Sequence, residues 1–313
     1  MRMTNLAKEL KPEKLGLPEL LDLLRTGSFS NLIEVIIKPG LKVLSEPERD
    51  NLLAALIYWK NKLDASQKLD RYLRSEFLIK HWDEFQASAD SRHLNEGLLY
   101  ALKYYIYKQA LNGYLELYNL SEVADPFVLK QLGRIYKGLG NYESALASLE
   151  LALTQARQDA RIMFLLADCY ALTGDETRAQ LFFREAFFLD PDAFELRDCE
   201  APAISNLIND LQAFGLGERE LKYWLPIYAN LAGLFKIKRE LKPLEIGRLT
   251  QSILELEEAY KKNPDNCLKA LLLNRYFWLI DHYRTIKAPL EDLQEILFKI
   301  KRLDAKLFAK YIL

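Results

Sequence analysis

Glycine, proline and long apolar runs are all scarce in this chain. Of its 313 residues, 13 are Gly and 11 are Pro, which excludes collagen-like and low-complexity classes. The same scarcity disfavours a β-sandwich, which needs a turn every ten residues or so. No window of about 18 residues is both apolar and free of charge, so no membrane-spanning segment is expected. The composition favours an all-α globular protein.

Cysteine is also rare, and its spacing fits neither a disulfide framework nor a zinc site. Cys169, Cys199 and Cys267 are far apart and odd in number, so reduced, buried thiols in a cytoplasmic protein are expected. The N-terminal residues are charged throughout and lack the apolar stretch of a secretory leader. A chain from which a leader had been removed would look the same.

Charge and motifs indicate neither a nucleic-acid-binding protein nor an enzyme. The 43 basic and 44 acidic residues give a net charge of −1, so no global field draws the protein to nucleic acid or to a membrane. His81, His93 and His282 lack metal-binding spacing, and phosphate-binding glycine loops and nucleophile elbows are missing from the sequence. We therefore expect no catalytic residues, no metal and no cofactor.

An internal repeat stands out in the middle of the chain, where residues 126–159 align with 160–193. When the two copies are aligned, large apolar residues match large apolar residues, and small residues match small ones. A glycine followed by Asn or Asp also occurs at the same place in both copies. The matching pairs are Leu129/Met163, Leu132/Leu166, Tyr136/Tyr170, Leu149/Phe183, Gly133/Ala167, Ala145/Ala179, Ala152/Ala186, Gly140/Gly174 and Asn141/Asp175.

Each copy predicts a helix, a tight turn and a second helix. Leu129, Leu132, Gly133 and Tyr136 lie at positions i, i+3, i+4 and i+7, which is one apolar stripe of a helix. Gly140 can end that helix in the left-handed conformation, with the following residue capping the next one. This pattern resembles the tetratricopeptide-repeat family.

The resemblance implies a right-handed α-solenoid of antiparallel helix pairs, with the first helix of each pair lining a concave, peptide-binding groove. The groove would not be the family's clamp for chaperone tails, because that clamp has Asn where this chain has Arg134 and Leu165. The basic residues at i, i+4 and i+7 of the first helix suit an acidic segment or a carboxylate. The groove residues expected are Phe127, Lys130, Gln131, Arg134, Lys137, Arg161, Phe164, Leu165 and Asp168.

Two alternatives apply to the groove. Flanking helices could fill it. Arg134 could also pair with Asp168, since the two residues occupy equivalent positions on neighbouring first helices.

The repeat register predicts four parts: a degenerate helical-repeat region (1–125), two repeats (126–193), a linker or irregular helices (194–217) and a C-terminal helical block (218–313). Apolar spacing predicts further helices on both sides of the repeats. Residues 33–37 are mostly β-branched and could form a helix or a strand. The helical segment 96–119 is expected to break near Asn112-Gly113. The remaining helices are expected at 18–24, 46–63, 67–85, 218–242, 244–263, 266–286 and 290–313.

Two other patterns allow a structural or a binding interpretation. A tyrosine cluster could stack on bases or sugars, but helix packing is the more economical interpretation. The basic runs that begin at Lys236 and Lys299 could contact RNA, but solvated helix ends are the more economical explanation. The cluster comprises Tyr100, Tyr104, Tyr105, Tyr107, Tyr114 and Tyr118.

The function expected is that of a cytoplasmic, non-enzymatic adaptor that binds a peptide or a helix of a partner protein. Self-association is left open. The alternatives are a carrier that encloses a small apolar ligand and an accessory factor of nucleic acid or of a transcription complex.

Overall fold

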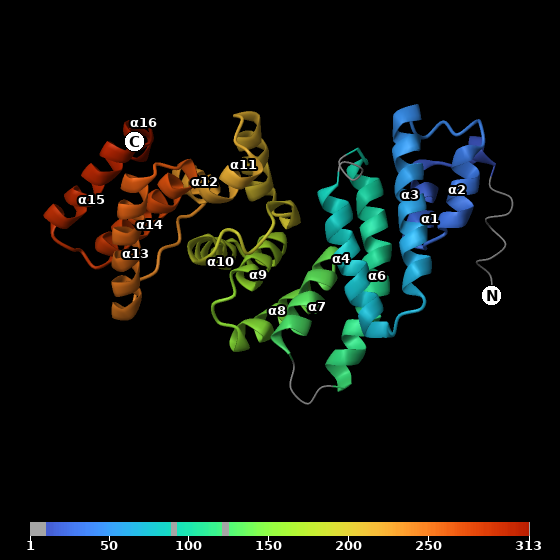
Figure 1. Cartoon of the computed structure of the whole chain (residues 1–313), viewed down its shortest axis with the longest axis horizontal. Coiled ribbons are helices and arrows are strands. Elements are labelled where there is room, and N and C mark those ends of the chain that lie inside the picture. Colours follow the sequence, from blue (N-terminus) through green and yellow to red (C-terminus); the bar gives the residue numbers. More distant parts are fainter. Residues whose placement is uncertain (1–10, 89–92, 121–124, 313) are drawn as a thin grey trace. The chain divides into compact units, whose positions relative to one another are not determined.

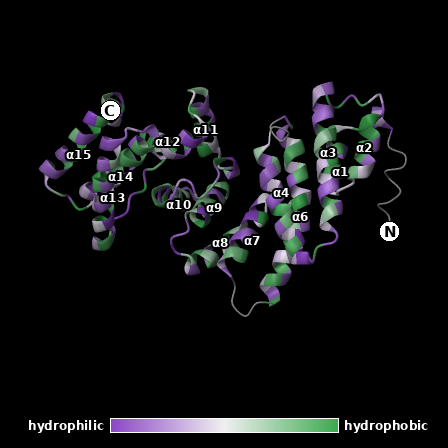
Figure 2. Ribbon diagram, viewed as in Figure 1, coloured by the Kyte–Doolittle hydropathy of each residue, from purple (hydrophilic) through white to green (hydrophobic). Residues whose placement is uncertain are grey.

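The computed structural model describes residues 11–88, 93–120 and 125–312, and every regular element within these ranges is a helix (Figure 1). The all-α prediction is therefore confirmed, while the handedness of the predicted solenoid stays a prediction. The chain divides into two compact units, Met1–Ser148 and Leu149–Leu313, which are described separately. Most helices carry both hydrophobic and hydrophilic residues (Figure 2), as expected where one face is buried.

The first unit is built around α6, which contacts α1, α4 and α7, while α3 contacts α2 and α4. The mostly β-branched segment 33–37 lies in α2 and is helical rather than extended. The elements are η2 (Pro12–Lys14), α1 (Leu17–Arg25), α2 (Phe29–Ile37), α3 (Glu46–Ser66), α4 (Arg71–Ala87), α6 (Glu96–Leu120), α7 (Pro126–Gly138) and the first part of α8 (Tyr142–Gln155).

Aromatic side chains fill the contact between α3 and α4. The rings of Trp59 and Trp82 stack with their centroids 5.7 Å apart, and Phe85 packs edge-on against Trp59 at 5.6 Å. All three side chains are buried. Large aromatic rings remove much apolar area from water, so this cluster is a main source of stability in the first unit.

The predicted break near Asn112-Gly113 is wrong, because α6 runs without interruption from residue 96 to residue 120. Gly113 serves a helix crossing instead of ending a helix. A Cβ atom at this position would lie 2.1 Å from the carbonyl oxygen of Arg71 and 2.4 Å from the hydroxyl of Ser75, both on α4. Only glycine lets the two backbones approach this closely.

The turn between α7 and α8 has the geometry that the repeat predicts. Gly140 has a φ of 77°, and its N–H donates to the carbonyl of Lys137 at 2.9 Å, while the N–H of Asn141 donates to the carbonyl of Tyr136 at 2.9 Å. These two bonds form a Schellman motif, which satisfies the last carbonyls of α7. The side chain of Asn141 then accepts from the N–H of Ser144 at 3.1 Å and caps α8.

The same turn recurs in the second copy of the repeat, within the second unit, between α9 (Ala160–Leu172) and α10 (Glu176–Leu189). Gly174 has a φ of 84°, and the N–H of Asp175 donates to the carbonyl of Tyr170 at 2.8 Å. The small residues that the two copies share, at 133, 145, 152, 167, 179 and 186, are all buried. The helix–turn–helix prediction is confirmed for both copies.

The second unit continues with helices that pack around α14, which contacts α12, α13 and α15. Two hydrophobic clusters form its interior, one around α9, α10 and α11 and the other around α14. The further elements are η3 (Leu196–Asp198), α11 (Pro202–Ala213), α12 (Glu218–Leu231), α13 (Pro243–Lys262), α14 (Asn266–Thr285), α15 (Leu290–Leu303) and α16 (Ala305–Tyr311).

Two of the predicted C-terminal helices are shorter than expected. The helix predicted over 218–242 ends at Leu231, because Gly233 takes a φ of 72° and the N–H of Leu234 turns back to the carbonyl of Ala229 at 2.8 Å. The helix predicted over 290–313 is divided into α15 and α16. Asp304 lies between the two helices and caps the second through the N–H of Leu307 at 2.9 Å.

The cysteine prediction is confirmed, since Cys169, Cys199 and Cys267 are buried, reduced thiols. Among the helices of the described ranges, none combines the length and the apolar character that a bilayer crossing requires.

Candidate partner-binding surface

The N-terminal part of α7 presents three of the predicted groove residues to solvent. The side chain of Phe127 is 41% exposed, and the ammonium group of Lys130 lies 5.9 Å from the centre of its ring. Lys130 and Gln131 are half-buried beside it. We call Phe127, Lys130 and Gln131 the α7 strip. It combines an aromatic ring, a cation and an amide.

Two predicted groove residues on the same helix lie beneath the surface. Arg134 is 5% exposed and Lys137 is 4% exposed. The guanidinium of Arg134 binds both carboxylate oxygens of Asp83 on α4, with one of the two bonds at 3.1 Å. Such a bidentate pair fixes orientation as well as distance. Arg134 therefore anchors α7 to α4.

On α9, the predicted groove residues are mostly part of the interior of the second unit. Phe164 and Leu165 are buried, and the ring of Phe164 stacks on Phe194 with centroids 4.1 Å apart. Arg161 is half-buried, and its guanidinium lies 3.9 Å from the carboxylate of Asp198. Of the four predicted on this helix, Arg161 is the one with appreciable exposure.

Asp168 orders the chain that follows α10. Its carboxylate accepts from the backbone N–H groups of Glu200 at 3.0 Å and Ala201 at 2.7 Å, and from the thiol of Cys199 at 3.2 Å. The side chain is fully buried. A buried carboxylate requires such donors. The predicted pairing of Asp168 with Arg134 stays a prediction.

The structure thus divides the predicted groove residues into accessible and buried sets. Those on α7 belong to the first unit and those on α9 to the second. The exposed or half-buried set is Phe127, Lys130, Gln131 and Arg161, and the buried set is Arg134, Lys137, Phe164, Leu165 and Asp168.

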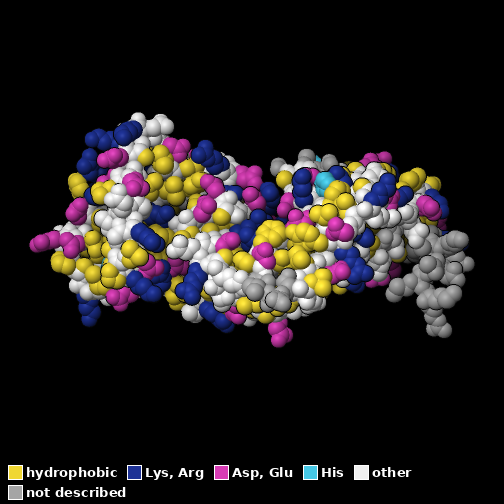
Figure 3. Space-filling model, turned by 60° about the horizontal axis from the view of Figure 1, so that its bottom comes forward, with side chains coloured by type: hydrophobic (Ala, Val, Ile, Leu, Met, Phe, Trp, Pro, Cys, Tyr) yellow, Lys and Arg dark blue, Asp and Glu magenta, His cyan; other side chains and the backbone are white. Residues whose placement is uncertain are grey.

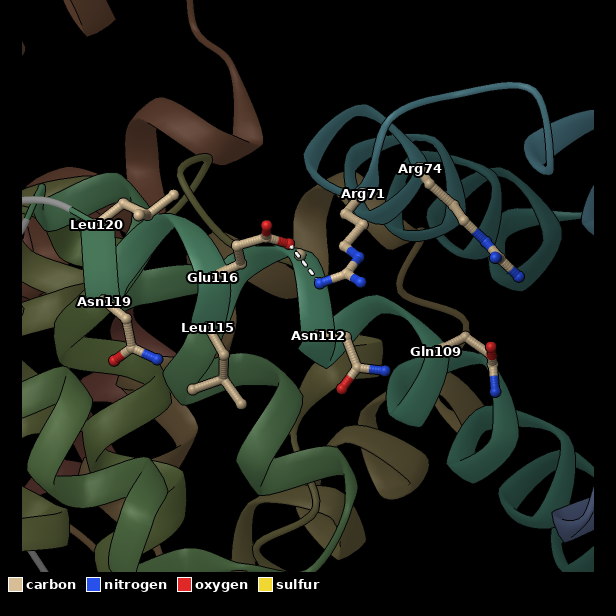
Figure 4. A pocket seen from close by; sticks show the side chains of 9 residues that line it. Arg71, Arg74, Gln109, Asn112, Leu115, Glu116, Asn119 and Leu120 are labelled. Carbon is tan, nitrogen blue, oxygen red and sulfur yellow. Dashed lines mark hydrogen bonds and ion pairs between the residues drawn. The ribbon is translucent and has the colours of Figure 1, made fainter.

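Sequence reasoning missed an open pocket of about 610 Å³ between α4 and α6 in the first unit. Figure 4 shows Arg71 and Arg74 extending from α4 above the side chains of α6. Arg71 pairs with Glu116 at 3.1 Å, and the buried Nε of Arg74 has no hydrogen-bond partner among the described residues. The signal was present as polar residues along one face of α6, namely Gln109, Asn112, Glu116 and Asn119.

The chemistry of this pocket suits the backbone of a peptide. Carboxamide side chains both donate and accept hydrogen bonds, as peptide groups do, and three of them line the pocket beside two arginines. Leu115 and Leu120 add a smaller apolar part to the wall.

Most of the tyrosine cluster packs within the first unit, while Tyr100 is exposed. Tyr107 and Tyr114 are buried, and the ring of Tyr105 lies edge-on to Phe29 at 5.1 Å. The hydroxyl of Tyr114 donates to Glu76 at 3.0 Å. Burial and the nearby Glu76 carboxylate raise the pKa of Tyr114 far above its usual range, so the hydroxyl remains protonated. These contacts favour the packing interpretation over a stacking platform for bases.

The basic runs contribute structural ion pairs. Lys238 pairs with Asp281 at 2.6 Å and Lys299 with Glu257 at 3.0 Å, while Arg239 binds the carboxylates of Glu185 and Glu245. Figure 3 shows basic, acidic and hydrophobic side chains interspersed on the visible face. Three of the six basic side chains in the two runs, Lys238, Arg239 and Lys299, are thus paired within the protein.

Within the described ranges, no group of three or more His, Cys, Asp or Glu side chains is placed to hold a metal ion.

Comparison with known proteins bears on the middle of the chain. Residues 138–198 match a family model described as "Tetratricopeptide repeat". Searches of curated proteins and of solved structures returned no significant match. The matched segment contains α9, α10 and the Schellman turn at Gly174. The repeated sequence pattern, the two helical hairpins and this match together identify a tetratricopeptide-repeat segment in the chain.

Proposed function

We propose that this protein is a non-enzymatic interaction module that binds an acidic peptide or helix of a partner protein through the α7 strip. Tetratricopeptide repeats mediate contacts between proteins, which supports the general class. The observation that carries the proposal is the contrast along α7. Phe127 is exposed and Lys130 is partly accessible, whereas Arg134 and Lys137 on the same helix are buried.

The α7 strip is held rigidly at both ends. Asp125 caps the helix by accepting from the N–H of Phe127 at 2.7 Å, and Pro126 occupies the first turn. The ion pair between Arg134 and Asp83 fixes the following turn. A surface that is already ordered loses little conformational entropy on binding, so a few contacts can give useful affinity.

The residues of the strip define the partner that it suits. An exposed phenylalanine provides apolar area, the adjacent lysine attracts a carboxylate, and the glutamine amide can bond a peptide group. A segment with an acidic residue next to an apolar one matches this order.

The test is site-specific photo-crosslinking from the full chain. A benzoylphenylalanine at position 127 should crosslink to a defined segment of a partner, to be identified by mass spectrometry. The same probe at position 298 on α15 is the control, because Phe298 is also exposed and has a cation, Arg302, 5.9 Å from its ring centre.

The identified segment is then titrated against purified variants. Lys130→Glu should weaken its binding at least tenfold and leave the melting temperature unchanged, whereas Arg302→Glu should leave both unchanged. Equal affinity for Lys130→Glu and the original chain would refute the proposal. Arg134 and Lys137 are unsuitable for this test, because charge reversal at a buried position also disturbs folding.

A further inference from the structure

A second pocket, of about 480 Å³, lies entirely within the second unit. Residues of α9, α10, α13 and α14 line it, together with the chain between α8 and α9 and the chain between α12 and α13. Four of its lining residues are arginines, of which Arg239 and Arg275, the latter on α14, are half-buried and the other two are exposed. Its volume falls within the range of small-ligand pockets, about 300–1,000 Å³.

Arg275 is held in place by the backbone and by an aromatic ring. Its Nη1 donates to the carbonyl of Phe188 at 2.7 Å, and its guanidinium lies over the Phe188 ring, 3.9 Å from the ring centre. Its Nε is buried without a hydrogen-bond partner. Among the residues that the structure describes, no carboxylate forms an ion pair with Arg275.

Two other arginines of this unit, the buried Arg184 and the half-buried Arg239, have carboxylate partners. Arg184 pairs with Asp281 at 2.7 Å, and Arg239 pairs with both Glu185 and Glu245. A guanidinium withdrawn from water without a counter-ion is costly, which is why such groups are usually paired. Arg275 is therefore an exception within its own unit.

The acidic residues of the pocket are already engaged. Glu185 and Glu245 both line the pocket, and both bind Arg239. The hydrogen bond from Arg239 holds the pKa of Glu245 below its usual range. Burial lowers the pKa of Arg275 to about 10, which still leaves its guanidinium charged at neutral pH. The exposed Arg157 and Arg248 add positive charge at the rim.

Apart from Gln158 and Ser252, the rest of the wall is apolar. Leu241 and Leu249 are buried, while Met163 and Leu189 are half-buried at the pocket surface. A strongly hydrated ion would lose its water against such side chains without compensation. The geometry suits a ligand with one negative charge and an apolar body.

We propose that this pocket binds a carboxylate that carries an apolar group, with Arg275 donating hydrogen bonds to the carboxylate oxygens and with Met163 and Leu189 contacting the apolar group. A free aliphatic acid and the carboxyl end of a peptide share this chemistry. The site belongs to the second unit and goes beyond the proposed function, which rests on the α7 strip of the first.

The test is calorimetric titration of the full chain with matched charged and neutral probes. Octanoate is compared with octanamide for the apolar body, and with acetate for the charge alone. A pentapeptide with a free C-terminal leucine is compared with the same peptide amidated. We expect octanoate, the free-acid peptide or both to bind at least tenfold more tightly than the matching amide. Acetate, which lacks the apolar body, should bind at least tenfold more weakly than octanoate.

Variants assign the binding to Arg275. Arg275→Met keeps an unbranched apolar side chain as far as the position of Nε, removes the guanidinium, and should lower the affinity at least tenfold. Arg178→Met is the matched control and should not change it, because Arg178 pairs with Asp175 and Glu150 outside the pocket. Met163→Glu places a carboxylate within the pocket and should also abolish binding. This second variant keeps the test decisive if Arg275→Met folds poorly.

Each outcome either overturns the proposal or shows which kind of carboxylate the pocket binds. Binding of octanoate alone supports a free aliphatic acid, and binding of the free-acid peptide alone supports a peptide end. The proposal is overturned if no probe binds, if acid and amide bind equally, or if Arg275→Met binds as the original chain does.

Discussion

Asp304 combines two stabilising roles in one side chain. Its carboxylate caps α16 through the N–H of Leu307, and it pairs with the ammonium of Lys269 on α14 at 2.7 Å. Burial alone would raise its pKa, but the bonds from Lys269 and from the backbone hold the pKa of Asp304 below its usual range. The ionised form is therefore favoured by folding.

We predict that Asp304→Asn destabilises the protein by about 1 kcal/mol at pH 7, since the amide still caps the helix but loses the charge pairing. A depressed folded-state pKa gives stability that is present above the unfolded pKa, near 4, and that disappears as the pH falls through the folded value. Urea unfolding at a series of pH values should show the difference shrinking below about pH 4.

Lys269→Met provides the control for this pH dependence. In that background Asp304→Asn should cost less, and its effect should vary less with pH, because only the backbone bonds then lower the pKa of Asp304. A constant difference between pH 7 and pH 3 in the original background would contradict the assignment.

Residue roles could be predicted from sequence only where helix periodicity decides them. The helical periodicity of α7 placed Phe127 outside the apolar stripe that packs against neighbouring helices, and its side chain is exposed. Periodicity could not show that Phe164 and Asp168 lie beneath the chain at 194–201, because that contact joins segments distant in the sequence. Arg275 had a signal that was not used, namely a charge within the largely apolar stretch 270–280.

At the scale of elements, glycine has two distinct uses in this chain. Gly140 and Gly174 end helices with positive φ, and their equivalent places in the two copies of the repeat made both turns predictable. Gly113 permits a close crossing of α4 and α6, and its local sequence resembles that of a helix end. The break predicted there was wrong because the deciding contact comes from another helix.

We predict that Gly113→Ala destabilises the first unit by about 1–3 kcal/mol, because the added methyl group would meet the backbone of α4. Urea unfolding measures this. Gly247→Ala is the matched control, since Gly247 lies within α13 and nothing lies within 4 Å of an added Cβ. That change should stabilise the protein by about 0.5–1 kcal/mol. A neutral Gly113→Ala would argue against the crossing.

At the scale of the whole molecule, the two compact units have separate hydrophobic clusters. The repeat register had indicated boundaries near residues 125, 193 and 217, which stay a prediction. The division at 148 falls inside α8, where the sequence shows no change of composition or period. The sequence can locate a repeat, but the boundary between compact units depends on contacts with residues that are distant in the sequence.

Separate cores lead us to predict local effects of core mutations. Leu56→Ala in the first unit should cost about 2–5 kcal/mol, because it leaves a cavity. Native-state hydrogen exchange should then be faster in peptides from residues 11–148 and unchanged in those from 149–312. The reciprocal variant is Leu273→Ala on α14, also fully buried. Equal acceleration in both units would show a single cooperative structure.

The burial of Cys169, Cys199 and Cys267 has a practical consequence. Maleimide reagents attack accessible thiolates, and burial raises the pKa of Cys267 further above the range in which it would ionise. A single cysteine engineered onto an exposed helix face can therefore carry a fluorophore or a spin label selectively, with all three native thiols left in place.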